Sequence, residues 1–500
     1  MGKPIDIAII VVYLVAMLAF GFWGKSRTKN SADFLVAGRR LGPALYTGTM
    51  AAVVLGGAST VGGVGLGYKY GISGMWLVVA IAIGLLALSL FFAGRIQRLR
   101  VYTVAQMLKL RYGVDATSTS GIVMAAYTLM LSVTSTIAYA TIFNVLFDTN
   151  RTLSVIIGGV IVMLYSSIGG MWSITLTDMV QFILKTIGIF FLLLPFTWHR
   201  AGGFDGIRER AGDAAFNLGT IGIGTIVTFF VVYTFGMLIG QDIWQRVFTA
   251  RSPQVAKWGG TTAAIYCLLY GVAGAVIGMA ASTFLGDVEA KDDVYAQIAE
   301  TILPVGISGI VLAAAVAAMM STASGALIAT ATVAKTDVKP LLLRVIGRGS
   351  AEEEVAERGT DERSDGKDDV HSDRLYVVVL GIAVIVIAAL LNDVVAALTV
   401  AYDILVGGLL VPILGGFLWK RATGAGALMA MAAGTVVTLG SMFFFGVLAN
   451  EPIYFGLAVS LVAYVVGSLA TERTPAEVLA VWDDRLAGRD TAPSAAPAQS

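Results

Sequence analysis

The chain has 500 residues, of which 57% are hydrophobic and only 13% are charged, and its mean hydropathy is +0.81. Soluble globular domains carry about 25% charged residues, so the composition excludes a soluble protein and predicts an all-α integral membrane protein in the lipid bilayer. The net charge of +1 gives no indication of a nucleic-acid partner. With one cysteine and two distant histidines, we expect neither a disulfide framework nor a clustered metal site, and no cofactor.

Apolar runs long enough to cross a bilayer as helices follow one another along most of the chain. We count about thirteen, which begin near Ile5, Ala44, Gly74, Gly121, Leu153, Trp172, Ile223, Gly260, Gly309, Leu375, Ala396, Gly426 and Tyr454. The first run, from Ile5 to Gly24, is too long for a signal peptide and precedes basic residues instead of a cleavage site, so we expect it to remain as a span.

The charges between the runs predict the orientation. The connections after the first, third, seventh and eleventh runs are rich in Lys and Arg, whereas those after the fourth, eighth and tenth carry mainly acidic residues. Because basic loops stay in the cytoplasm, we expect a protein of the cell membrane with its amino terminus outside and its carboxyl terminus in the cytoplasm.

Two segments outside the runs look solvated. Residues 335–374 contain the acidic stretch "AEEEVAERGTDERSDGKDD", and residues 473–500 end in "GRDTAPSAAPAQS". These compositions are typical of flexible chain, so we interpret them as a charged cytoplasmic insertion and a disordered tail. Between Asp287 and Pro304, apolar residues recur every fourth position, which indicates a short outer helix.

The second run, "TMAAVVLGGASTVGGVGLGYKYG", is unusually rich in glycine and carries Ser59 and Thr60. Two interpretations are open. The glycines can allow close helix packing, or the helix can be discontinuous, with unwound backbone lining a polar site at the middle of the bilayer.

The ninth run contains "MMSTASG", in which Ala318, Ser321 and Thr322 share one helix face and Ser324 and Gly325 lie close to it. A carbonyl oxygen beside two hydroxyl oxygens suits an alkali cation. The alternative is a packing stripe whose hydroxyls bond to carbonyls one turn earlier.

Charged residues inside the membrane are costly and often functional. In the sixth run Asp178, Gln181 and Lys185 form one polar stripe. Lys185 can pair with Asp403 of the eleventh run, bind a substrate carboxylate or extend toward the surface. We interpret Asp242 and Arg246, in "GQDIWQR", as an ion pair at a loop edge.

Several motifs together resemble the sodium:solute symporter family. In chain order they are "SADFLVAGRRLGP", "TVAQMLKLRYG", "GGMWSITLTDMVQ", "WQRVFTARSP" and "GFLWKRATGAGAL". The third, with its glycine pair, Thr-Asp and Gln, is the most specific. The resemblance covers nearly the whole membrane part, and the motifs occur in the family's order and topology.

The resemblance implies the LeuT-type fold, two inverted repeats of five helices with one helix before and two after. The expected parts are residues 1–43 with the first helix, 44–196 and 197–419 as the repeats, 420–472 with the last two helices, and the tail 473–500. The second and seventh spans would be the broken helices.

The resemblance also implies ion ligands. One sodium ion would bind Ala52, Leu55 and Ala318 through carbonyl oxygens and Ser321 and Thr322 through hydroxyls. Some family members hold a second sodium ion, for which Asp178 and Ser324 match the ligand positions. Gly325 stands where another serine ligand is expected, which favours one sodium ion per solute, and Asp178 could instead line the exit path.

The function implied is sodium-coupled symport of a small solute by alternating access, with no chemical transformation. Candidate solute-binding residues are Gly56, Gly57, Ser59, Thr60, Gln241, Trp244, Asp403 and Lys185. Small hydroxyls and a lysine favour an amino acid or small carboxylate over a sugar. Proton coupling and a transporter-like sensor are the alternatives, and an intramembrane protease is disfavoured because no second aspartate motif is present. Oligomeric state is not indicated.

Overall fold

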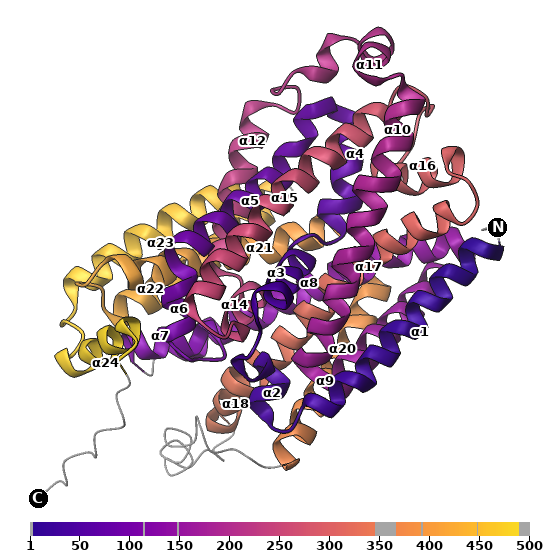
Figure 1. The fold of residues 1–500 in the computed structure, drawn as a ribbon. Coiled ribbons are helices and arrows are strands. Elements are labelled where there is room, and N and C mark those ends of the chain that lie inside the picture. Colours follow the sequence, from indigo (N-terminus) through magenta and orange to yellow (C-terminus); the bar gives the residue numbers. More distant parts are fainter. Residues whose placement is uncertain are drawn as a thin grey trace, which may run out of the picture.

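The computed structural model describes residues 4–113, 116–147, 150–345, 367–391, 394–447 and 449–489. Within these ranges the chain forms a bundle of long helices, and several short helices lie toward its two ends (Figure 1). The helices α11 (Gly203–Ala211), α12 (Ile223–Phe229) and α16 (Val294–Ile302) lie toward one end. The helices α2 (Ser31–Val36), α18 (Lys339–Val345) and α24 (Ala476–Ala487) lie toward the other. Residues 346–366, which hold most of the acidic stretch, and the residues after Arg489 lie outside the described residues. The rest of the predicted flexible insertion 335–374 is helical instead, because α18 and the start of α20 (Lys367–Leu390) lie within it.

The helix bounds follow the apolar runs of the sequence. In chain order they are α1 (Pro4–Arg27), α2 (Ser31–Val36), α3 (Pro43–Val54), α4 (Gly63–Tyr70), α5 (Trp76–Ala87), α6 (Gly94–Arg98), α7 (Val104–Tyr112), α8 (Ala116–Phe147), α9 (Arg151–Thr186), α10 (Leu194–Ala201), α11 (Gly203–Ala211), α12 (Ile223–Phe229), α13 (Phe235–Ile239), α14 (Gln241–Thr249), α15 (Pro253–Ala281), α16 (Val294–Ile302), α17 (Ile307–Val333), α18 (Lys339–Val345), α20 (Lys367–Leu390), α21 (Val394–Leu418), α22 (Gly424–Phe445), α23 (Glu451–Ala470) and α24 (Ala476–Ala487).

In the described part of the chain, ten helices are long and apolar enough to cross a membrane, or up to eleven if one bent pair counts as a span. The sequence predicts about thirteen. The difference arises because two of the ten are too long for one crossing, at 41 and 51 residues. The longer contains Gly170 with φ 55° and ψ −141°, a backbone geometry that no continuous helix has, so two spans meet there.

Both predicted broken helices are confirmed. After α3, Leu55 leaves the helical conformation with φ −92° and ψ 72°, and the chain becomes helical again at Gly57. In the seventh span, Gly240 has an extended conformation, and the helices on either side of it meet at a bend of 42°. Each break leaves backbone carbonyls without helical partners.

The family-like motifs meet one another at the end of the bundle that carries α2. Arg111 of the second motif donates hydrogen bonds to the carbonyl oxygens of Gly416 and Trp419 in the last, both at 3.0 Å. Leu41, ahead of α3, forms a parallel backbone bridge with Ala250, which follows α14. The motifs therefore hold together segments that are far apart in the sequence.

Two predictions about the connections have different outcomes. The short helix expected between Asp287 and Pro304 is confirmed by α16. The segment 473–500 was expected to be disordered, but α24 forms within it. The helix is held by Trp482, which is buried and packs against Phe417 with the ring centroids 5.3 Å apart. The sequence did not indicate this contact, because the residues around Trp482 are charged.

Candidate ion and solute sites

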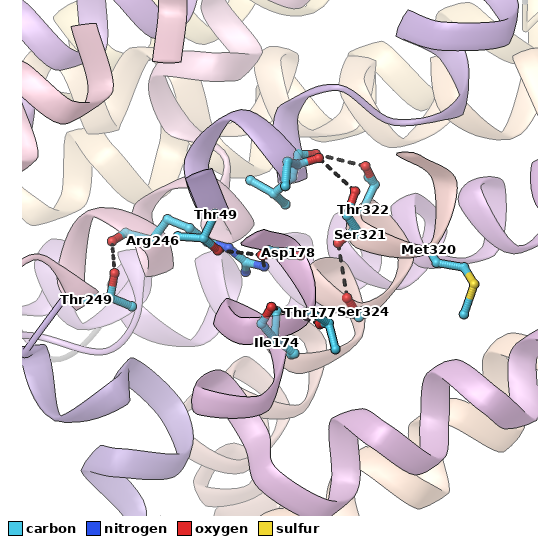
Figure 2. Close-up of polar contacts among 12 residues, drawn as sticks. Thr49, Ile174, Thr177, Asp178, Arg246, Thr249, Met320, Ser321, Thr322 and Ser324 are labelled. Atoms are coloured by element: carbon cyan, nitrogen blue, oxygen red, sulfur yellow. Dashed lines mark hydrogen bonds and ion pairs between the residues drawn. The ribbon is translucent and has the colours of Figure 1, made fainter. Parts of the chain in front are cut away.

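The predicted ion ligands of α3 and α17 lie together. The Ser321 hydroxyl donates hydrogen bonds to the carbonyl oxygens of Ala52 and Ala318, both at 2.8 Å. The Thr322 hydroxyl donates to the carbonyl oxygen of Val53 at 2.8 Å, and both side chains point from α17 toward the end of α3 (Figure 2). All are buried. The break after α3 makes this possible, because its last carbonyl oxygens have lost their helical donors.

Gly56 lets the two helices approach closely. A Cβ atom at this position would lie 2.5 Å from the Thr322 hydroxyl oxygen, closer than any real contact. The glycines of the second run therefore serve both interpretations left open by the sequence, since they break the helix and also bring its carbonyls against α17.

Lys185 reaches the same cluster from α9. Its Nζ atom donates to the carbonyl oxygens of Ala52 at 2.8 Å and Leu55 at 3.0 Å, and the side chain is fully buried. These are two of the three carbonyls predicted as sodium ligands. The sequence suggested that Lys185 pairs with Asp403, binds a substrate carboxylate or extends toward the surface, and none of these is the contact observed. The contact could not be predicted, because these carbonyls are available only where α3 ends.

Asp178 of α9 forms a second polar centre with Thr49 and Arg246. It accepts hydrogen bonds from the Thr49 hydroxyl and from the Arg246 guanidinium, the latter at 3.3 Å (Figure 2). The interpretation of Arg246 as part of a loop-edge pair with Asp242 is wrong, since Arg246 is fully buried and its ion pair is with Asp178.

Gly325 explains how Arg246 fits there. A Cβ atom on Gly325 would lie 2.7 Å from Nη2 of Arg246. The position that would hold another serine ligand of a second sodium ion is thus the space taken by the guanidinium. Ser324 donates to the carbonyl oxygen of Ser321 at 3.1 Å, within its own helix.

A cavity of about 50 Å³ lies beside the ion cluster. It is lined by Gly56, Gly57 and Ser59 at the break of the second span, by Thr322, and by residues of α8, α13, α14 and α21. A larger cavity of about 140 Å³ shares Gly57 with it and extends to Lys291 and Asp292, ahead of α16. The two cavities are therefore neighbours, and the larger one lies nearer to the end of the bundle that carries α16.

Asp242 lines the smaller cavity, although the sequence indicated for it only an ion pair with Arg246. It is buried and accepts a hydrogen bond from the Tyr127 hydroxyl at 3.0 Å. The sequence offered one signal: Asp242 directly follows Gly240-Gln241, where a glycine can end a helix. Its direction depends on the bend at that glycine.

The other candidate solute ligands do not line this cavity. Thr60 forms a hydrogen bond with the Tyr270 hydroxyl, and Gln241 bonds to the backbone of Tyr102 and Val104. Trp244 donates to the carbonyl oxygen of Leu238. Asp403 is buried on α21, next to the lining residue Tyr402. The hydrogen bonds of Thr60, Gln241 and Trp244 thus join segments around the cavity.

Two broken helices near a buried polar centre, with a cavity beside them, are the arrangement found in secondary transporters of the LeuT-type fold. The model of the sodium:solute symporter family matches residues 34–434. The chain belongs to this family of sodium-coupled solute symporters, as its motifs indicate, and is a multi-pass membrane protein.

Relatives and solved structures agree with this assignment. The high-affinity proline transporter PutP of Bacillus subtilis (strain 168) is 25% identical over 446 residues, which cover 85% of this chain and 89% of the relative. The sodium/proline symporter of Staphylococcus aureus (strain JH9) is 25% identical over 488 residues, with 92% and 90% covered.

The fold is similar to that of a Na⁺-coupled sialic acid symporter in a substrate-bound outward-open state. Its TM-score is 0.81 at 17% identity, with 95% of this chain and 99% of the other covered. Mhp1, a nucleobase-cation-symport-1 family transporter in a closed conformation, has a TM-score of 0.58 at 15% identity, with 90% and 98% covered. Both matches show the LeuT-type fold of this chain.

Proposed function

We propose that this protein couples the inward movement of sodium to the uptake of an amino acid, and that the oxygens of Ala52, Leu55, Ala318, Ser321 and Thr322 hold the ion. The observation that carries this is that the hydroxyls of Ser321 and Thr322 meet the carbonyl oxygens of α3 and of Ala318 at the break of the second span, in a member of a sodium-coupled family. The Leu55 carbonyl oxygen is joined to that of Ala52 by Lys185, which donates to both. Neutral oxygens of this kind suit a monovalent hard cation.

The solute would bind in the smaller cavity. The backbone N–H groups at Gly57 and Ala58 begin a helix, and such a positive end attracts a carboxylate. Asp242, across the same cavity, offers a negative charge to an amino group. An amino acid carries both groups, and proline, the substrate named for the relatives above, is the first to test.

Sodium and solute would be linked through the break itself. Thr322 belongs to the ion cluster and also lines the cavity, as does Gly56. Sodium would hold α3 against α17 and so shape the solute site, and the solute would strengthen sodium binding by the same factor. Movement of the repeats 44–196 and 197–419 against each other would then open the other side.

The orientation of the protein in the membrane is inferred from the basic loops. We place the amino terminus and the loop around Lys291 and Asp292 outside the cell, and the carboxyl terminus and the segment 335–374 in the cytoplasm. Solute would enter through the larger cavity.

Uptake by proteoliposomes tests the proposal. Purified protein would be given labelled proline, other amino acids and small carboxylates, with an inward gradient of sodium, potassium or choline. We expect uptake of an amino acid only with sodium. Equal uptake in all three salts would overturn sodium coupling, and uptake confined to a sugar or a carboxylate without an amine would overturn the solute class.

A further inference from the structure

The smaller cavity has an aromatic side. Tyr233, between α12 and α13, and Tyr402 of α21 both line it. Their ring centroids are 5.4 Å apart and their planes are inclined by 64°, so the two rings form an angled wall. A third ring, that of Tyr127 on α8, lies edge-on to Tyr402 at 5.5 Å and 80°.

A negative charge lies at the same side of the cavity. Among the described residues that line the cavity, Asp242 alone is charged. The Tyr127 hydroxyl, whose ring contacts Tyr402, donates to Oδ1 of Asp242 at 3.0 Å. This bond uses part of the capacity of the carboxylate to accept hydrogen bonds. A cation in the cavity is therefore attracted toward the tyrosine rings, and it meets a carboxylate that is already partly hydrogen-bonded.

Two glycines of the seventh span leave room for these side chains. A Cβ atom on Gly236 would lie 2.5 Å from Cδ1 of Tyr402, so any side chain there would displace the ring. A Cβ atom on Gly240 would lie 2.9 Å from Oδ1 of Asp242 and 3.1 Å from the hydroxyl oxygen of Tyr127. The backbone of the broken helix thus fixes the positions of the ring and of the carboxylate.

Aromatic rings and a carboxylate together suit an ammonium group that carries carbon substituents. The face of a tyrosine ring attracts a cation, and carbon atoms bound to a positive nitrogen share its charge without needing a hydrogen-bond acceptor. A primary ammonium group instead brings three N–H donors, each of which needs an acceptor when it leaves water. Most residues around the cavity are apolar. An alkylated amine therefore enters it at a lower desolvation cost than a primary amine.

We propose that Tyr233 and Tyr402 make this carrier selective for amino acids whose nitrogen carries alkyl groups, such as a secondary ring amine or an N-methylated glycine. The substituents on nitrogen would contact the two rings, and Asp242 would balance the positive charge. This inference rests on the proposed function, because it concerns the same solute site, and it narrows the class of solute. Proline, as a secondary ring amine, falls within that class.

Glycine and its mono-, di- and trimethylated forms test the inference, because they differ only in the methyl groups on nitrogen. Binding of each compound to the purified full-length protein would be measured by isothermal titration calorimetry, in sodium buffer and again in potassium buffer. We expect the dissociation constant in sodium to fall as methyl groups are added, by about tenfold or more over the series.

Variants of the rings test where this preference arises. Tyr233→Leu and Tyr402→Leu each remove one ring and should abolish most of the preference, whereas Tyr402→Phe keeps the ring and should keep the order of affinities. Gly236→Ala should weaken binding of the trimethylated compound, since the new Cβ atom would displace the ring of Tyr402. Tyr454→Leu removes a partly exposed ring of α23 outside the cavity and serves as control.

The outcomes separate this inference from the proposed function. If glycine binds wild type as tightly as its methylated forms do, the inference is overturned and sodium-coupled uptake of an amino acid stands. A preference that persists in both leucine variants, although they fold as judged by thermal unfolding, would overturn the role of the rings. The same affinities in sodium and in potassium, with the methylated forms preferred, would support the inference and overturn sodium coupling.

Discussion

The guanidinium group of Arg246 lies 3.3 Å from the carboxylate of Asp178, and both side chains are fully buried. The pair joins α14, the second half of one broken helix, to α9, and Thr49 links it to α3. Removal of one partner from such a pair leaves a buried charge uncompensated, which typically costs about 3 to 5 kcal/mol. The two residues therefore have to be present together.

Substitution Asp178→Asn should lower the stability of the protein by about 3 kcal/mol, because the amide is neutral and Arg246 then lacks a counter-charge. Thermal unfolding in detergent measures this. The matched control is Asp213→Asn, which breaks the exposed pair of Asp213 with Arg208 and should change stability by less than about 0.5 kcal/mol. If both variants lost similar stability, the buried pair would contribute no more to stability than the exposed pair does.

Gly325→Ser should displace the Arg246 side chain, since the new Cβ atom would lie 2.7 Å from Nη2 and 2.8 Å from a methyl carbon of Val53. We expect a clear fall in melting temperature, with a loss of about 1 to 3 kcal/mol, as found for overpacking. Gly224→Ser is the control, because no atom lies within 4 Å of its Cβ position. If the two variants melt alike, Gly325 is not required for the guanidinium to fit.

The paired substitution Ser321→Ala and Thr322→Ala should raise the sodium concentration needed for half-maximal uptake by tenfold or more, about 1.4 kcal/mol, because two proposed ligands are lost. Thr330→Ala provides the control on the same helix, since its hydroxyl donates to the carbonyl oxygen of Ala326 one turn earlier. An unchanged sodium requirement in the paired variant would place the ion elsewhere.

Asp242→Asn should weaken amino-acid binding about 10- to 100-fold, because a hydrogen bond to a charged group contributes about 1.5 to 3 kcal/mol. The half-saturating solute concentration measures this, and the sodium requirement should change much less. Asp205→Asn on α11 removes an exposed carboxylate and serves as control. A solute affinity equal to wild type would mean that Asp242 faces the cavity without touching the solute.

Local patterns in the sequence predicted the features that depend on neighbouring residues. The glycines around Gly56 allowed a broken helix beside close packing, and the family resemblance favoured the break. The spacing of Ser321 and Thr322 placed both hydroxyls on one face. The partners of charged groups could not be predicted in this way. Arg246 and Asp178 are 68 residues apart, and their contact depends on how α14 turns after Gly240. The direction of Lys185 likewise depends on carbonyls that only the break of α3 exposes.

The backbone bridge between Leu41 and Ala250 joins the two broken helices at one end. The Leu41 N–H donates to the carbonyl oxygen of Thr249, and the Arg251 N–H donates to that of Leu41, both at 3.0 Å. Because this short ribbon begins α3 and ends α14, tilting one helix without the other would break both bonds. The two helices are therefore expected to tilt together when the transporter changes conformation.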